Sequence, residues 1–231
     1  QYHETRQALF LNEFLKNFKG NILTDGYPAY DQVFKLLPDI IPAGCNAHNR
    51  RYFLDAYDEG KHKVAEEPIL IYRELYKIES EIKDLSPEER LKSRQELSRP
   101  LMERFFAYLK EKESRVTPKS LLGKAVHYAL NQWPKLVVFL DDPSIPIDNN
   151  VIENAIRPFV VGRKNWMIFG GPRGANASCF IYSLIETAKL NGHDPYLYLN
   201  YLFQKLPQAR TDDDIRLLLP FNLSPVTRGN S

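Results

Sequence analysis

Short apolar runs alternate with helical patterns near the start of the chain. The run Asn21–Thr24 predicts a strand, which the turn dipeptide Asp25-Gly26 ends, and a second short strand is predicted at Ile40–Pro42. The other predicted elements are the end of a strand before Ala8, helices at Ala8–Asn17 and Tyr27–Leu36, and a helix after Gly44 with Phe53, Ala56 and Tyr57 facing inward. Strands and helices in alternation favour the α/β class.

The middle of the chain has a different pattern, in which Lys, Glu and Leu recur at helical spacing from about Val64 to Phe139. Helices are predicted at Pro68–Asp84, at Ser86–Lys112 and from Pro118 beyond Asn131. We interpret this stretch as an all-helical insertion between the predicted strands and the segment that follows. Beyond it, the Asn-Gly and Asp-Pro turn signals of residues 191–195 separate two further helices, Ala175–Leu190 and Pro195–Leu206.

In the segment Ile145–Gly171, the acidic residue Glu153 lies among amides, arginines and apolar side chains. A helix that begins near Asp148, as its N-cap, places Asn149, Glu153 and Arg157 on one stripe. The neighbouring apolar face consists of Ile152, Ala155, Ile156 and Phe159. Pro158 is expected to kink or end this helix, because it has no backbone N–H. The glycine-bearing segments Gly162–Trp166 and Gly170–Gly174 then bracket a predicted strand, Trp166–Phe169.

Two acidic residues are candidate metal ligands. Asp25 follows a predicted strand, at the edge where open α/β sheets place their ligands. Glu153 leaves its helix among hydrogen-bond donors, a setting that suits a metal-holding carboxylate beside a bound polyanion. Each has a simpler explanation that the sequence leaves open: Asp-Gly is a common turn dipeptide, and Glu153 with Arg157 fits a solvated ion pair.

Basic and aromatic residues near Glu153 are candidates for contact with a nucleic acid. Arg163, Lys164 and Arg173 can pair with phosphates, and an exposed Trp166 can stack on a base that has left the duplex. For Trp166, packing in the core is the alternative and the usual role of a large aromatic side chain.

Two other polar groups favour structural interpretations. The spacing Cys45-x-x-His48 is found in zinc sites, but such a site needs four ligands and no second pair has suitable spacing, so a structural role is favoured. Thr211 is predicted to cap a helix whose first turn carries the acidic run Asp212–Asp214.

Four blocks of sequence, in order, carry a resemblance to a known family. They are LTDGYPAYDQV (Leu23–Val33), GCNAHNRRYFLDA (Gly44–Ala56), IDNNVIENAIRPFVVGRKNWMIFGG (Ile147–Gly171) and YSLIETAKLNGHDPYLYLNYL (Tyr182–Leu202). Together they resemble the insertion sequence sixty-six family of bacterial transposases over nearly the whole chain. The helical middle of the chain resembles the family in its helical pattern but not in particular residues.

The resemblance implies a ribonuclease-H-like core in which an Asp, Asp, Glu triad holds Mg²⁺ or Mn²⁺, as a two-metal site, for DNA cleavage and joining. Asp25 matches the second Asp and Glu153 matches the Glu. His48 and Arg51, on one side of a predicted helix, and Asn149 are then expected neighbours of the active site. The implied partners are DNA, as transposon ends and target, and further copies of the protein. Arg157, Arg163, Lys164, Trp166 and Arg173 are the expected DNA contacts.

The first Asp of the triad is where this chain departs from the family pattern. The family carries it in an Asp-Glu-Thr motif on an upstream strand, and nothing of that kind precedes Asp25. We therefore expect a carboxyl-terminal fragment that lacks the first strands of the core and is inactive by itself. Two other functions stay open: a ribonuclease-H-like nuclease or resolvase that cleaves without joining, and a catalytically silent DNA-binding or regulatory protein derived from a transposase.

These interpretations divide the chain into four parts. The core is expected at residues 1–61 and 141–174, the helical insertion at 62–140, and a carboxyl-terminal helical region at 175–231.

A chain of 231 residues, 43% of them hydrophobic, is long enough for a sizeable core. Because the net charge is only +2, DNA contact must come from local patches. Two cysteines and the lack of a long apolar run lead us to expect a soluble, cytoplasmic protein without a membrane partner.

Overall fold

The computed structural model describes residues 8–166 and 170–227, with the backbone alone for Ala8, Arg163 and Trp166. The described chain forms two compact units, which we call the first unit (residues up to Asn150) and the second unit (from Val151). The expected strand end before Ala8 lies outside the described residues.

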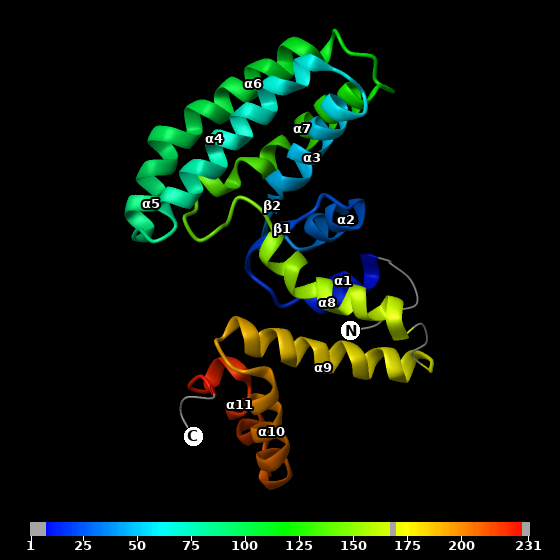
Figure 1. Ribbon diagram of the computed structural model, residues 1–231, viewed down its shortest axis with the longest axis vertical. Coiled ribbons are helices and arrows are strands. Elements are labelled where there is room, and N and C mark those ends of the chain that lie inside the picture. The colour runs from blue at the N-terminus through cyan, green and yellow to red at the C-terminus, as the bar shows by residue number, and fades with distance from the viewer. Residues whose placement is uncertain (1–7, 167–169, 228–231) are drawn as a thin grey trace. The chain divides into compact units, whose positions relative to one another are not determined.

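The first unit combines a two-stranded sheet with a bundle of helices, among which α4 and α6 run side by side (Figure 1). Its elements are α1 (Ala8–Leu15), β1 (Gly20–Thr24), α2 (Pro28–Leu36), β2 (Ile40–Gly44), α3 (Asn46–Asp58), α4 (Glu66–Ile82), α5 (Pro87–Ser93), η2 (Arg94–Ser98), α6 (Arg99–Glu113) and α7 (Leu121–Leu136), with one-turn helices at Lys63–Ala65 and Val138–Leu140. The predicted strands and helices are therefore present, with ends shifted by a few residues. The described chain is mostly helical, and it keeps the α/β character in this one small sheet.

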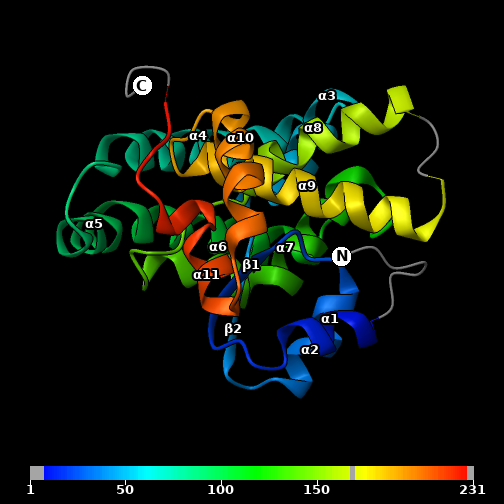
Figure 2. The same ribbon diagram turned by 90° about the horizontal axis from the view of Figure 1, so that it is seen from below.

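The two strands of the sheet are parallel and pair from Gly20 with Ile40 to Thr24 with Gly44. Parallel strands need a crossover connection, and α2 supplies it. Helices α1 and α2 lie side by side (Figure 2). Because the strands run the same way, the residues that follow them, Asp25 and Cys45, share one edge of the sheet. The backbone N–H of Cys45 donates to the carbonyl of Thr24 at 3.0 Å, which extends the ladder to that edge.

Aromatic rings form the centre of the first unit's core. Phe105 lies in edge contact with Phe53, Tyr72 and Trp133, with ring centroids between 5.4 and 5.9 Å apart. Phe53 and Ala56 are fully buried, as predicted. The prediction for Tyr57 is wrong: its side chain is 37% exposed, because it lies beyond the edge of the buried stripe in the last turn of α3.

The predicted helix Ser86–Lys112 is continuous, but it contains a wider turn. Ser86 begins it with a capping box to Glu89, and the π-helical turn η2 joins α5 to α6. In η2 the N–H of Arg99 donates to the carbonyl of Arg94, five residues back. Pro100 follows immediately, and a proline cannot donate to the carbonyl four residues before it. The wide turn is a way for the helix to pass this proline without ending.

Arg94, the first residue of the wide turn, is 1% exposed. Its guanidinium donates twice to the carboxylate of Glu79, at 2.9 and 2.6 Å. The same group donates to the carbonyls of Phe139, Asp142 and Ile145, at 2.7 to 3.0 Å. One buried cation thus joins α4, η2 and the segment between α7 and α8.

Helices are the only regular secondary structure among the described residues of the second unit. Its elements are α8 (Asn150–Trp166), α9 (Pro172–Leu190), α10 (Pro195–Lys205) and α11 (Asp212–Leu217), with one-turn helices at Leu206–Gln208 and Pro220–Asn222. Its small core is formed by Ala188, Tyr198, Leu202 and Leu218. Thr211 caps α11 through a capping box with Asp214, as predicted. No helix in the described part of the chain is long and apolar enough to cross a bilayer.

A kink or an end was predicted for α8 at Pro158. The helix does not end there but continues to Trp166, since a proline removes one hydrogen bond and those on either side hold the helix. The prediction for the residues that follow is wrong. Gly162–Trp166, expected to be the loop before a strand, is therefore the last part of α8. The rest of that predicted strand, residues 167–169, lies outside the described residues.

Candidate functional site

Asp25 lies directly after β1, at the carboxyl edge of the sheet, and is exposed. One carboxylate oxygen, Oδ1, accepts the backbone N–H of Tyr27 at 3.0 Å, so the turn interpretation is confirmed. The other oxygen, Oδ2, has no hydrogen bond among the described residues. The carboxylate can therefore make the turn and still offer an oxygen to a ligand.

The second strand leads into α3 at the same edge through Cys45. Its thiol is 1% exposed, and burial raises its pKa, an effect that the backbone amides of Asn149, His48 and Ala47 oppose. A buried, protonated thiol is a poor metal ligand, which agrees with the structural role favoured for Cys45. On α3, one turn later, His48 is half-buried and Arg51 is exposed. Their part in a site stays a prediction.

A buried hydrogen-bond network of two amides and a phenol lies behind this edge. The hydroxyl of Tyr72 donates to Oδ1 of Asn46 at 3.1 Å and accepts from Nδ2 of Asn49 at 2.7 Å. Nδ2 of Asn46 also donates to the carbonyl of Leu136 at 3.0 Å, and all three side chains of the network are fully buried. The network explains the two Asn residues of the CNAHN block: they join α3 to α4 and α7. Sequence patterns did not predict these contacts.

Replacing Tyr72 with Phe should destabilise the protein by about 1–3 kcal/mol for each buried group that it leaves without a partner. The aromatic ring and its packing stay, but Nδ2 of Asn49 and Oδ1 of Asn46 lose their contact. Urea unfolding followed by circular dichroism measures the change. Tyr57→Phe is the control, since that ring is on the surface of α3. Equal stability of the two variants would contradict a structural role for the network.

The segment before α8 is fixed to the first unit at several points. The N–H of Asn46 donates to the carbonyl of Ile147 at 3.1 Å. The hydroxyl of Tyr76 donates to Oδ2 of Asp148 at 2.6 Å; burial and this hydrogen bond both raise the pKa of Tyr76, so the phenol stays a donor. Asp148 accepts the N–H of Asn150 at 3.0 Å, which makes it the cap acceptor at the start of α8. Asn149 precedes the helix, so it does not continue the predicted stripe of Glu153.

In the second unit, α8 carries Glu153 in its first turn, where the helix dipole favours a negative charge. Glu153 is half-buried, while Arg157 and Lys164 are exposed one and three turns later on the same side of the helix. The neighbouring face, Ile152, Ala155, Ile156 and Phe159, lines a groove of about 490 Å³ that α9 completes. Phe159 meets Tyr182 of α9 edge-on in this groove, at 5.3 Å between ring centroids. The predicted apolar face is therefore confirmed.

Other residues predicted for DNA contact lie at the end of α8 and the start of α9. Arg173 is exposed in the first turn of α9. The side chains of Arg163 and Trp166 lie outside the described part of the chain, and their contact with DNA stays a prediction. Asp25 belongs to the first unit and Glu153 to the second, each described within its own unit. Their convergence on a shared ion also stays a prediction.

The side chains at the edge of the sheet include oxygen donors that suit a hard cation. Beside Asp25, Oγ1 of Thr24 is enclosed and makes no hydrogen bond within the described residues, and the same holds for Oδ1 of Asn149. Oxygen atoms of carboxylates, hydroxyls, amides and water are the ligands that Mg²⁺ and Mn²⁺ prefer. The donor set therefore fits the divalent metal that the family resemblance implies.

Comparison with known proteins gives the chain a family. Residues 1–177 match the family described as Transposase IS66 family, and residues 183–221 match the IS66 C-terminal element. No solved structure matches the chain.

Three similar proteins come from Sinorhizobium fredii (strain NBRC 101917 / NGR234), and each is named as an uncharacterized protein. To y4jD the chain is 34% identical over 227 residues, which cover 96% of this chain and 44% of that protein. To y4qI it is 32% identical over 235 residues, 99% of this chain and 44% of that protein. The chain spans less than half the length of these relatives. From the two family matches and these relatives, the chain belongs to the IS66 family of transposases.

Proposed function

We propose that this chain forms part of the catalytic domain of a DDE transposase, which cleaves DNA and joins it to a target with Mg²⁺ or Mn²⁺. The observation that carries the proposal is Asp25, an exposed carboxylate at the carboxyl edge of a parallel sheet, of which only one oxygen is used by its own turn. Family membership supports a transposase role and implies a divalent metal. In this proposal β1 and β2 are strands of a ribonuclease-H-like core, and the helices from α4 to α7 belong to its insertion.

Asp25 and Glu153 are the residues that would hold the metal. When bound, two such ions stabilise the attacking and leaving oxygens of an in-line displacement at phosphorus. The protein's own contribution is to fix the direction of each carboxylate. Asp25 is fixed by its turn, and Glu153 by the first turn of α8. Two cations close together repel each other, so several anionic ligands are needed around them.

DNA is the proposed partner of the basic side of α8. Arg157 and Lys164 share a side of the helix with Glu153, and phosphate contacts there would hold a backbone beside the carboxylate. Arg163, Arg173 and Trp166 extend the same proposal toward α9. We also propose that copies of the protein associate during transposition, so that one active site is available for each of the two transposon ends.

The proposal is tested with the longest natural polypeptide that contains these 231 residues, which we call the extended protein. It is incubated with Mg²⁺ and duplexes that carry the ends of its own element, and both cleaved and joined products are measured. Cleavage followed by joining supports a transposase. Cleavage without joining assigns the protein to the nucleases or resolvases. Binding with neither product leaves a catalytically silent DNA-binding protein.

Replacing Lys164 or Arg163 with Ala should weaken binding to duplexes of any sequence. Each loss of a phosphate contact should also reduce the slope of log affinity against log salt by about one. Fluorescence anisotropy over a series of salt concentrations measures both quantities. Lys77→Ala is the matched control, since Lys77 is an exposed lysine of α4 that pairs with Glu81. If Lys164→Ala and Arg163→Ala behave like this control, the end of α8 does not contact DNA.

A further inference from the structure

The backbone that carries Asp25 is held by a side chain from a distant part of the sequence. The hydroxyl of Tyr128, on α7, donates to the backbone carbonyl of Asp25 at 2.9 Å, across 103 residues. On the other side of the same residue, Oδ1 accepts the N–H of Tyr27. Asp25 is therefore fixed once through its carbonyl and once through its carboxylate. Only the second contact is local.

Gly26 shows how closely Tyr128 approaches this turn. Its φ of +81° is in the left-handed region that favours glycine. A Cβ at this position would lie 2.8 Å from the hydroxyl oxygen of Tyr128, which is too short for a real contact. A larger residue at position 26 would thus be strained and would also push the tyrosine hydroxyl away from Asp25.

Tyr128 is half-buried, and its ring is held by a neighbouring helix. The ring stacks on Tyr52 of α3, with centroids 4.5 Å apart, and α3 packs along α7. The position of the Tyr128 hydroxyl, and with it the turn after β1, therefore depends on the packing of these two helices.

We propose that Tyr128 is a positioning residue for Asp25: its hydroxyl sets the direction in which the carboxylate meets a divalent cation. The inference rests on the proposed function of Asp25 as a metal ligand. A ligand must be held within about 0.5 Å and 10–20° of its working geometry, and outer partners of metal ligands typically contribute 10–100-fold to affinity or activity. Tyr128 touches neither the metal nor DNA in this role.

The test is Tyr128→Phe in the extended protein, because Phe keeps the ring on Tyr52 and removes only the hydroxyl. The Mg²⁺ concentration for half-maximal cleavage should rise about 10–100-fold. The maximal rate at saturating Mn²⁺ should fall far less. Binding without turnover is the second measurement: Mn²⁺ titrated into protein and DNA, followed by the electron paramagnetic resonance of the free ion, should show affinity reduced by the same factor. Gly26→Ala should shift both measurements in the same direction.

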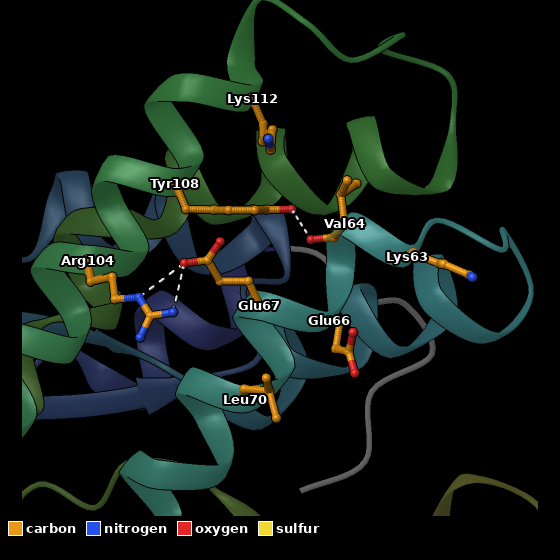
Figure 3. A pocket seen from close by; sticks show the side chains of 8 residues that line it. All are labelled: Lys63, Val64, Glu66, Glu67, Leu70, Arg104, Tyr108 and Lys112. Atoms are coloured by element: carbon orange, nitrogen blue, oxygen red, sulfur yellow. Dashed lines mark hydrogen bonds and ion pairs between the residues drawn. The ribbon is translucent and has the colours of Figure 1, made fainter.

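Tyr108→Phe is the matched control. Its hydroxyl also donates to a backbone carbonyl, that of Val64, at 2.9 Å, and its ring is part of the core. That bond lies beside a shallow pocket of about 250 Å³ lined by Glu67 and Arg104 (Figure 3), away from the edge of the sheet that Asp25 occupies. Tyr108→Phe should leave the metal dependence unchanged.

The outcomes separate this inference from the function on which it rests. If Asp25→Asn leaves cleavage intact, the proposed function fails and the role of Tyr128 fails with it. If Asp25→Asn abolishes cleavage but Tyr128→Phe and Gly26→Ala match Tyr108→Phe in metal dependence, the inference alone is overturned. A rise in the required Mg²⁺ that is confined to the variants of Tyr128 and Gly26 supports it.

Discussion

Asp25→Asn and Glu153→Gln should each abolish Mg²⁺-dependent cleavage by the extended protein. Each change keeps the size of the side chain and removes the charge that would hold the metal. Because the metal contributes several kcal/mol to the transition state, the rate should fall on the order of 10³-fold or more. Stability should change little: Asp25 is exposed, and the amide oxygen of Asn can still accept the N–H of Tyr27. Cleavage of end-labelled duplexes and thermal unfolding measure the two effects.

Asp39→Asn is the control for Asp25→Asn. Asp39 is an exposed aspartate that pairs with Lys19 and lies directly before β2, at the opposite edge of the sheet. Its replacement should leave cleavage unchanged. The 231 residues alone should not cleave, since Asp25 and Glu153 are the two carboxylates in them that match the family triad. Robust cleavage by this chain that survives both substitutions would show that other carboxylates hold the metal.

Arg94→Met should destabilise the protein by about 3–5 kcal/mol, the usual cost of removing one partner from a buried ion pair. The change leaves the carboxylate of Glu79 and three carbonyls without their donor. Met is unbranched and fills much of the same space, so lost packing contributes less than lost hydrogen bonds. Urea unfolding, with the midpoint and slope both fitted, measures the loss.

The surface pair Arg104–Glu67 is the control for the buried one. Arg104 donates to Glu67 at 3.0 and 3.1 Å, but both side chains are about half exposed. Arg104→Met should therefore cost about 0–1 kcal/mol. The double variant Arg94→Met with Glu79→Leu should recover part of the stability, because no unpaired charge is left behind. A cost for Arg94→Met as small as that for Arg104→Met would show that its hydrogen bonds contribute little.

Local signals predicted the elements around the candidate site. Asp25-Gly26 marks the end of β1 because few residues other than glycine adopt the φ of +81° found there. The same reasoning failed at Gly162, where a glycine and the earlier Pro158 suggested an end, but α8 continues through both. A helix whose other hydrogen bonds are intact tolerates one unfavourable residue. In this chain, Gly after Asp correctly predicted a turn, whereas Gly and Pro within a long helix did not correctly predict where the helix ends.

The contacts that sequence patterns missed join residues far apart in the chain. Sequence patterns did not single out Arg94, and only the fold shows that it donates to carbonyls 45 to 51 residues later. Nor did they single out Tyr128, whose hydroxyl donates to the carbonyl of Asp25 across 103 residues. Periodicity describes which face a residue occupies. It carries no information about which distant backbone that face will meet.

The long span between Asn21 and Asp142 has a consequence for synthesis on the ribosome. Nδ2 of Asn21, on β1, donates to Asp142 at 2.7 Å across 121 residues, so this contact cannot form until that aspartate leaves the exit tunnel. At roughly 5–20 residues per second, translation takes about 6–24 s to cover that distance. In that interval β1 can pair with β2, which follows it closely in the sequence, and the helices from α3 to α7 can form locally, while the side chain of Asn21 is without this partner.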